Sequence, residues 1–384
     1  MIALIRHANV YAPERMGIQD VLIVAGKIWR IGKDLSEWSD YSGIKTIEGN
    51  ERHLVPGFID QHVHILGGGG AAGFGSRGPE LSFTETVLAG ITTVVGCVGA
   101  DQVGRDLHSL LAKTRSLEFR GITAKMLSGG FDHRVTLTGN VKTDLYLIDN
   151  VIGSKAAVSD RRSVQPSHDE LKRLMAESMI GGLLSDKAGI VQIHMGDAAT
   201  GLTPLMTAQK ESEVPIKYIV PTHINRNELL MEQAIEWTRM GGVVDLTPGI
   251  APPDFKRAVK SSKGVMTLLA AGVPVEQITL STDANGVHTI HGFENISRNP
   301  LTLLYNEFCD LVLKEGLSIV DSLKCVSTNV ARVLRMPEKG RIVENADADL
   351  LMLEPDSLKI DMVIARGKIL AENGKMTNPQ KLDV

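Results

Sequence analysis

The sequence has little of several features that mark particular protein classes. It has three cysteines among 384 residues, Cys97, Cys309 and Cys325, and their odd number and wide spacing fit neither a disulfide framework nor a zinc or redox motif. A reducing compartment fits such a chain best, and we expect a cytoplasmic location. The N-terminus lacks a basic head followed by an apolar core, and no apolar run reaches membrane-spanning length. We therefore expect neither a signal peptide nor a membrane span.

Charge of one sign is scarce as well. The formal net charge is −4, the isoelectric point is about 6.3, and no long run of like charges occurs. The composition therefore gives no reason to expect nucleic acid or an anionic membrane as a partner. The content of 43% hydrophobic and 22% charged residues is ordinary for a soluble globular protein, and the length suits one large domain with a small one, or two medium ones.

Both ends of the chain share one pattern of short strands. The predicted strands there are residues 1–10, 21–32, 349–353 and 362–370. The second and fourth of these runs each contain a Gly-Lys turn, so each is expected to form two strands. We predict that residues 1–54 and 342–384 together form a small β-sandwich domain. Two separate β-appendages are the alternative.

The middle of the chain, residues 55–341, alternates short β-branched runs with longer helical patterns. The predicted strands are residues 58–64, 92–98, 123–127, 151–157, 190–194, 218–223, 243–246 and 278–282. The predicted helices include residues 167–180, 227–240 and 254–271, and Ser167 with Glu170 forms a capping box for the first. Eight strands alternating with helices predict a TIM-type (β/α)₈ barrel as the catalytic domain. A doubly wound open sheet has the same rhythm and is the alternative.

Polar residues with metal-binding chemistry occur on five of the predicted strands. His62 and His64 are two residues apart, so both side chains point to one face of a strand and could bind the same divalent metal. The others are Lys155, His194, His223 and Asp283. In a barrel the carboxyl ends of all strands meet on one face, where active sites lie. Lys155 stands among apolar residues, and because burial of an unpaired ammonium is costly, it must be paired, deprotonated or modified.

This set of six residues resembles the binuclear metal site of the amidohydrolase superfamily. The sequences that follow its members are similar to those of the isoaspartyl dipeptidases, which hydrolyse β-aspartyl dipeptides. These stretches are residues 67–70, 159–163, 194–197, 221–227 and 283–286. The resemblance implies two divalent metal ions, usually zinc, bridged by an N6-carboxylated Lys155. It also implies a homo-oligomer, and attack by a metal-bridging hydroxide with Asp283 as general base and then general acid.

The resemblance also suggests where a small-molecule substrate binds. Arg162 and Arg226 each follow a metal-site residue and are candidates to clamp substrate carboxylates. The backbone of the glycine run that contains Gly69 is expected to line the cleft.

Three residues depart from the family pattern at substrate positions. Ala71 stands where a glutamate holds the α-amino group, Phe131 where a tyrosine donates to the oxyanion, and Val287 where a serine contacts a carboxylate. His133, in the same loop as Phe131, could donate to an oxyanion instead.

We therefore predict a metal-dependent hydrolase of an amide bond, similar to the isoaspartyl dipeptidases. Its substrate is expected to carry a carboxylate, and Ala71 suggests a substrate without a free α-amino group. The first alternative is a hydrolase of cyclic amides or N-acyl amino acids, similar to dihydroorotases and hydantoinases. The second is a non-catalytic scaffold with the amidohydrolase fold, which the complete set of six ligand positions disfavours.

Overall fold

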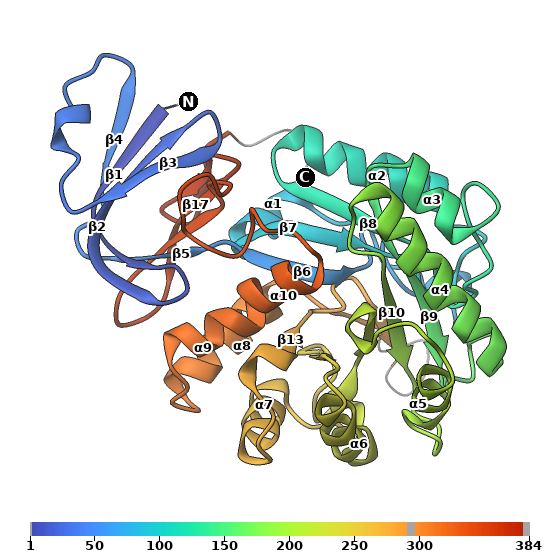
Figure 1. Cartoon of the computed structure of the whole chain (residues 1–384). Helices are drawn as coiled ribbons and strands as arrows, with labels where there is room; N and C mark the ends of the chain where they lie inside the picture. Colours follow the sequence, from blue (N-terminus) through green and yellow to red (C-terminus); the bar gives the residue numbers. More distant parts are fainter. Residues whose placement is uncertain (1, 290–295, 379–384) are drawn as a thin grey trace.

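The computed structural model describes residues 2–289 and 296–378. One sheet of nine strands is built from both ends of the chain (Figure 1). Its strands are β1 (Ile2–Tyr11), β2 (Arg15–Val24), β3 (Lys27–Gly32), β4 (Ile44–Glu48), β5 (His53–Pro56), β16 (Leu350–Leu353), β17 (Ile360–Ala365), β18 (Lys368–Glu372) and β19 (Lys375–Met376). The order is β19-β18-β17-β16-β5-β1-β2-β3, with β4 beside β1, so the antiparallel pair β5–β16 joins the two chain ends. A shared sheet from both ends is confirmed, whereas the exact domain boundaries stay a prediction.

The middle of the chain forms a curled parallel sheet. Its strands are β6 (Phe58–Val63), β7 (Ile91–Gly96), β8 (Thr123–Gly129), β9 (Val151–Val158), β10 (Ile190–Met195), β11 (Ile219–Thr222), β12 (Val244–Leu246) and β13 (Ile278–Leu280). β6 to β11 form one parallel ladder in chain order, and β12 pairs with β13. Val63 at the end of β6 bridges in parallel to Ala284 beyond β13, so the first and last strands meet. The predicted barrel and all eight of its strands are confirmed.

A buried layer of polar side chains links strands where backbone pairing is short. Asp245 of β12 accepts hydrogen bonds from Thr222 of β11 at 2.6 Å and from Gln61 of β6 at 2.7 Å. Asp60 of β6 likewise accepts from the Thr282 hydroxyl at 2.5 Å. Burial raises the pKa of Asp245 to about 6 and that of Asp60 to about 7, although these hydrogen bonds lower both. These buried hydrogen bonds hold the strand ends in fixed positions.

Helices cover the outside of the barrel (Figure 1). They are α1 (Phe83–Leu88), α2 (Leu107–Arg120), α3 (Val141–Leu147), α4 (His168–Ser185), α5 (Thr203–Lys210), α6 (Glu228–Arg239), α7 (Ser261–Ala270), α8 (Thr302–Leu313), α9 (Ile319–Leu323) and α10 (Asn329–Val333). The predicted capping box of α4 is confirmed, with both Ser167 and Glu170 bonded to the other's backbone N–H. No helix in the described ranges combines the length and apolarity that a bilayer crossing requires.

The helix predicted over residues 254–271 was wrong at its start, because α7 begins only at Ser261. Asn225 explains the difference. Its side-chain amide N–H groups donate to the backbone carbonyls of Ile250 and Val259 at 2.8 and 2.9 Å. The backbone carbonyl of Asn225 accepts from the Val259 N–H at 2.8 Å. These bonds hold the segment before α7 against the end of β11 and prevent it from joining the helix.

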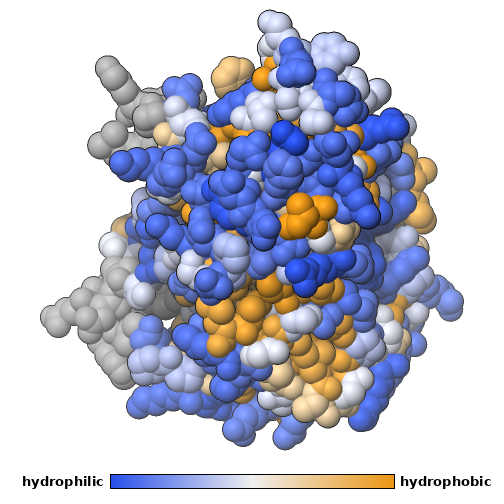
Figure 2. Space-filling model, turned by 90° about the vertical axis from the view of Figure 1, so that its left-hand side faces the viewer, coloured by the Kyte–Doolittle hydropathy of each residue, from blue (hydrophilic) through white to orange (hydrophobic). Residues whose placement is uncertain are grey.

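A buried lysine connects the two parts of the fold. Lys339 donates to Asp349 and Asp347, just before β16, at 2.6 Å each, and to Thr123 at the start of β8 at 2.7 Å. The composite sheet is thus tied to the amino-terminal side of the barrel, opposite the carboxyl strand ends. On the face drawn in Figure 2, hydrophilic residues cover most of the surface and an apolar area lies in the lower half.

Candidate metal centre and cavity

The six predicted ligand positions come together at the carboxyl ends of the barrel strands. His62, Lys155 and His223 are fully buried, and His64, His194 and Asp283 are at least nine-tenths buried. His223 and Asp283 both have left-handed backbone conformations, with φ of 67° and 52°. Such strain in non-glycine residues is common at functional sites, where the surrounding structure fixes a side chain in an uncommon direction.

Asp283 lies beside the histidine pair. Its Oδ1 atom is 3.0 Å from His64 Nε2 and 3.5 Å from His62 Nε2. The Nε2 atom of His62 also lies 2.8 Å from Lys155 Nζ. Four of the six predicted ligands thus form one contiguous cluster.

His194 and His223 form the other part of the site. Their rings pack edge to face with centroids 4.5 Å apart, and the His223 ring lies 5.0 Å from that of His62. His223 Nδ1 is 2.8 Å from the Thr247 hydroxyl, and His194 Nε2 is 3.0 Å from Asp160 Oδ2. These partners fix the orientation of both rings, as is usual for the second nitrogen of a metal-binding histidine.

The protonation states suit cation binding. Burial lowers the pKa of His64, lowers those of His62 and His223 well below the ordinary range, and lowers that of His194 to about 3. All four imidazoles are therefore neutral near pH 7, which is the form that binds a metal. Burial alone would raise the pKa of Asp283, but the neighbouring imidazoles hold it well below the ordinary value, so this group is a carboxylate.

Several buried nitrogens of the cluster have no hydrogen-bond partner. They are Nδ1 of His62, Nδ1 of His64 and Nε2 of His223. Unsatisfied buried polar atoms are rare and costly in native proteins, and a bound ion is one way to satisfy them. Two groups of residues could each hold a metal ion, because the potential ligand atoms within each group lie within 4.8 Å of one another. One group is His62, His64 and Cys97, and the other is His62, His223 and Asp283. The residues therefore fit a divalent cation.

Lys155 has neighbours that the sequence did not indicate. Its Nζ atom contacts His62 Nε2 and lies 3.0 Å from Cys97 Sγ. Within the described residues, no carboxylate pairs with this buried amine. Carboxylation of Lys155 stays a prediction, and it would replace a costly buried cation with anionic oxygen ligands.

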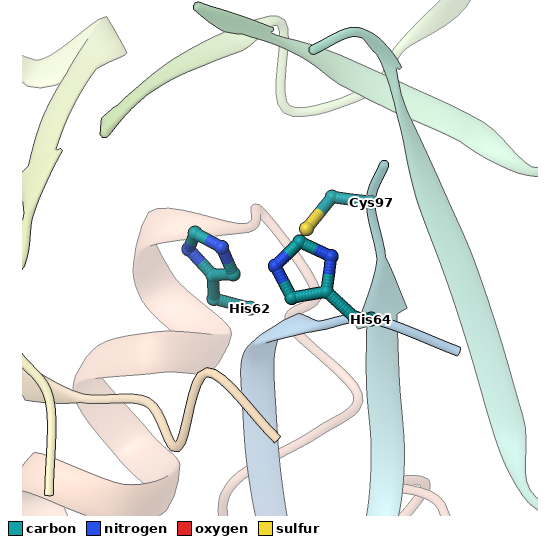
Figure 3. Close-up of side chains that lie close together, drawn as sticks. All are labelled: His62, His64 and Cys97. Carbon is teal, nitrogen blue, oxygen red and sulfur yellow. The ribbon is translucent and has the colours of Figure 1, made fainter. Parts of the chain in front are cut away.

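Cys97 is the site residue that the sequence analysis missed. It directly follows β7 and lies beside His62 on β6 and His64 just after that strand (Figure 3). The spacing among the three cysteines carries no signal for this site. The available signal is the position of Cys97 near the end of the predicted strand 92–98, which is the kind of position that the histidines also occupy.

A cavity of about 850 Å³ opens above the cluster. This volume suits a ligand of dipeptide size. His64, His194 and Asp283 line its floor, and six of the seven predicted substrate-binding residues line its walls: Gly69, Ala71, Phe131, Arg162, Arg226 and Val287. His133 is buried and does not line the cavity, so the structure does not bring it to the site.

The two predicted carboxylate clamps differ in their surroundings. Arg162 is bound by two parallel hydrogen bonds to Asp160, and its side chain is 38% exposed. The Arg226 side chain is only 6% exposed. Among residues 2–289 and 296–378, its Nε has no partner and its one ion pair is to Asp197 at 3.6 Å. Burial lowers the pKa of Arg226, although the guanidinium stays charged at neutral pH. Arg226 is thus a buried cation with little compensation, facing the cavity.

The three departures from the family pattern lie on the cavity wall. Phe131 packs on the ring of His194 at 4.6 Å, and the Arg162 guanidinium lies 5.0 Å from the Phe131 ring centroid. Val287 lies against Gly69, whose φ of 90° and close contact with the Ser76 carbonyl exclude a side chain there. Ala71 is exposed in the loop that follows Gly69. The wall is accordingly more apolar than the family pattern implies.

Comparison with known proteins agrees with this arrangement. A family model described as the amidohydrolase family matches residues 53–370. The structure of the β-aspartyl dipeptidase from Fervidobacterium islandicum AW-1, in complex with the dipeptide β-Asp-Leu, is similar, with 34% identity, a TM-score of 0.91, and coverage of 99% of this chain and 100% of that chain.

More distant similarities show the fold alone. Dihydropyrimidinase from Brevibacillus agri NCHU1002 shares 18% identity at a TM-score of 0.68, with 98% of this chain and 96% of that chain covered. Adenine deaminase from Geobacillus kaustophilus is 21% identical over 94% of this chain, which spans only 55% of that enzyme's length.

Proposed function

The chain belongs to the amidohydrolase family and to its isoaspartyl dipeptidase branch, and we propose that it is a metal-dependent hydrolase of an amide bond in a small substrate that carries a carboxylate. The observation that carries the proposal is the cluster of buried imidazoles around Asp283, three of which have a ring nitrogen without a partner, beneath a cavity that Arg226 lines. Neutral histidines next to a carboxylate form a metal site, and a buried arginine on the wall forms an anion site.

In this proposal His62, His64, His194, His223, Lys155 and Asp283 hold two divalent cations, with zinc as the expected metal. When bound, the cations would polarise the scissile carbonyl and make an attacking water more acidic. Carboxylation of Lys155 would provide a bridging anion between them. Thr247 and Asp160 keep the rings of His223 and His194 in the orientations that ligand binding needs.

Asp283 is the proposed proton carrier. Its carboxylate is ionised, lines the cavity and lies 3.0 Å from His64. In that form it can accept a proton from the attacking water and then return it to the leaving amine, so one residue performs general base and general acid catalysis in turn.

Arg226 and Arg162 are the proposed substrate anchors. Arg226 is the stronger candidate because a substrate carboxylate would compensate its buried charge. Asp160 already satisfies two donors of Arg162, which therefore offers a substrate only its remaining N–H groups.

The apolar residues Ala71, Phe131 and Val287 favour a substrate without a free α-amino group. No carboxylate at position 71 is available to compensate an ammonium, and an N-acylated β-aspartyl dipeptide would place an uncharged group there. A hydrolase of cyclic amides is the second candidate, because the same apolar wall would also accept a ring that lacks an ammonium.

A substrate panel tests the proposal. Protein reconstituted with Zn²⁺ is assayed against β-aspartyl dipeptides, their N-acylated forms and cyclic imides. We expect hydrolysis of one amide class, with the N-acylated dipeptides preferred over the free ones. Robust turnover of free dipeptides would reject the role given to Ala71, and no turnover of any member by metal-loaded protein would reject the hydrolase proposal.

Lys155→Ala tests the metal centre, with Lys187→Ala as the control. Lys187 is a half-buried lysine that caps the carbonyls of Leu145 and Ile148 on the outside of the barrel. We expect Lys155→Ala to lose metal content and activity and Lys187→Ala to keep both. Full metal content and full activity in Lys155→Ala would contradict the bridging role of Lys155.

We also propose that the protein is a homo-oligomer. Helices α3 and α4 pack together and leave Tyr146, Leu147, Leu183 and Leu184 more than half exposed. Exposed apolar side chains gathered on neighbouring helices mark interaction surfaces. Light scattering coupled to size-exclusion chromatography measures the mass in solution, and a monomer at all concentrations would reject this proposal.

A further inference from the structure

Cys97 is held in place beside the histidine pair. Its backbone N–H donates to the Val63 carbonyl at 2.9 Å, which joins the end of β7 to the strand that carries His62 and His64. The residue is 1% exposed. Its Sγ atom and one ring nitrogen from each of the two histidines all lie within 4.8 Å of one another (Figure 3).

The surroundings of the Cys97 sulfur are polar, unlike those of a packing cysteine. A buried free cysteine usually behaves as a small apolar side chain. Cys325 fits that description, because it belongs to the main hydrophobic cluster. Cys97 also belongs to a hydrophobic cluster, but its sulfur lies 3.0 Å from the Lys155 amine and beside two imidazoles that each have an unpaired Nδ1.

We propose that Cys97 is a ligand of the metal centre, bound as a thiolate to the cation that His62 and His64 hold. On binding, the S–H bond breaks, the proton leaves to solvent, and a sulfur lone pair forms the bond to the metal. Two imidazoles and one thiolate are a donor set that zinc accepts readily. This inference rests on the metal centre of the proposed function.

A thiolate ligand changes which cations the site prefers. Sulfur is a soft donor, whereas the carboxylate and carbamate ligands are hard. With Cys97 in the ligand set, the site should favour thiophilic cations such as Zn²⁺ and Cd²⁺ over Mn²⁺. The sulfur also contributes a negative charge next to Lys155, which would otherwise have to come from carboxylation.

Cobalt spectroscopy tests the proposal without reference to activity. The full-length protein is stripped of metal and reloaded with Co²⁺, and its near-ultraviolet absorption is measured together with the bound cobalt. The variants are Cys97→Ser, Cys97→Val and, as the matched buried control, Cys325→Ser. We expect a sulfur-to-cobalt charge-transfer band in the wild type and in Cys325→Ser, and its loss in both Cys97 variants.

Metal competition provides a second readout on the same proteins. We expect Cys97→Ser to reduce the ratio of Cd²⁺ affinity to Mn²⁺ affinity by roughly tenfold or more, because even groups outside the ligand set are worth about 10- to 100-fold in metal affinity. Circular dichroism establishes that each variant is folded. An unchanged ratio would contradict the inference.

The wild type alone decides the main question, so a variant that fails to fold does not obscure it. Cobalt bound without a charge-transfer band overturns the role of Cys97 and leaves the proposed function standing. A band in the wild type without hydrolysis of any panel member supports Cys97 as a ligand and rejects the hydrolase. A wild type that binds no cobalt overturns both proposals.

Discussion

The guanidinium of Arg162 and the carboxylate of Asp160 form a bidentate ion pair at the cavity wall, with Nε to Oδ1 at 2.9 Å and Nη2 to Oδ2 at 2.7 Å. Oδ2 of Asp160 also lies 3.0 Å from His194 Nε2. Burial alone would raise the pKa of Asp160, but these contacts with Arg162 and His194 hold it far below its ordinary range. One carboxylate thus orients both a proposed substrate anchor and a proposed metal ligand.

Asp160→Asn should weaken substrate binding and metal binding together. The amide has one acceptor oxygen instead of two, so it cannot hold both partners. We expect a loss of about 10- to 100-fold in kcat/KM, since hydrogen bonds to charged groups are worth about 1.5–3 kcal/mol, measured with the preferred substrate of the panel. Asp132→Asn is the matched control, because Asp132 and Arg134 form the same bidentate ion pair away from the cavity. Equal effects of the two substitutions would contradict the role of Asp160.

Arg226→Gln should raise KM for substrates that carry a carboxylate. Glutamine keeps hydrogen-bonding capacity but removes the buried charge, and we expect a loss of about 10- to 100-fold in kcat/KM on the same energetic scale. Steady-state kinetics with a carboxylate substrate and with its amide distinguish anion binding from general damage, because only the carboxylate should be affected. Arg161→Gln, another arginine that lines the cavity, should have a smaller effect.

Ala71→Glu should increase the hydrolysis of free β-aspartyl dipeptides relative to their N-acylated forms. The introduced carboxylate would meet the α-amino group at the position that the family uses for it. The measurement is the ratio of kcat/KM for the two substrates. Ala72→Glu, with a carboxylate one residue further along the same cavity-lining loop, is the control. A ratio that moves equally in both variants would indicate a general effect of charge instead.

Phe131→Tyr should increase kcat by supplying a hydroxyl near the reacting carbonyl. A single oxyanion donor is worth about 10²–10³ in rate when it is well placed, so a gain of even tenfold would be informative. Phe255→Tyr adds the same hydroxyl elsewhere on the cavity wall and should leave kcat unchanged. No gain in Phe131→Tyr would show that another group already stabilises the oxyanion or that the ring lies too far from it.

Lys339 should govern the stability of the whole chain at both extremes of pH. Burial would lower the pKa of Lys339, but Asp349 and Asp347 raise it above 10.5. Burial would raise the pKa of Asp347, but Lys339 and Lys27 lower it below 3.8. The stabilisation from Asp347 is therefore present above pH 3.8 and lost as pH falls through its folded pKa. That from Lys339 is present below pH 10.5 and lost as pH rises through its folded pKa.

Thermal unfolding as a function of pH measures this effect. Lys339→Met leaves two carboxylates without their buried partner and should cost about 3–5 kcal/mol near neutral pH, with a flatter pH dependence than the wild type. Lys314→Met removes an exposed lysine from its ion pair with Asp310 and should change little. Similar losses in the two variants would contradict the structural role of Lys339.

The strand positions and the gathering of the six proposed ligands at one end of the barrel were predictable from the sequence because both leave local signals. Runs of β-branched residues end in a histidine or aspartate, and the barrel geometry then brings those ends together. The start of α7 was not predictable, since the Asn225 side chain that holds the preceding segment comes from a distant loop. The contact between Lys155 on β9 and Cys97 after β7 likewise depends on how these strands align on the two sides of β8.

The parallel bridge between Val63 and Ala284 makes the proposed metal centre depend on closure of the barrel. His62 lies on the first barrel strand and Asp283 follows the last one, so the two side chains become neighbours only when the sheet has closed. A nascent chain whose β13 has not yet left the ribosome lacks the aspartate of the site. Because a ligand stabilises the state that binds it, a cation held by the complete set of residues would favour the closed barrel over partly made ones.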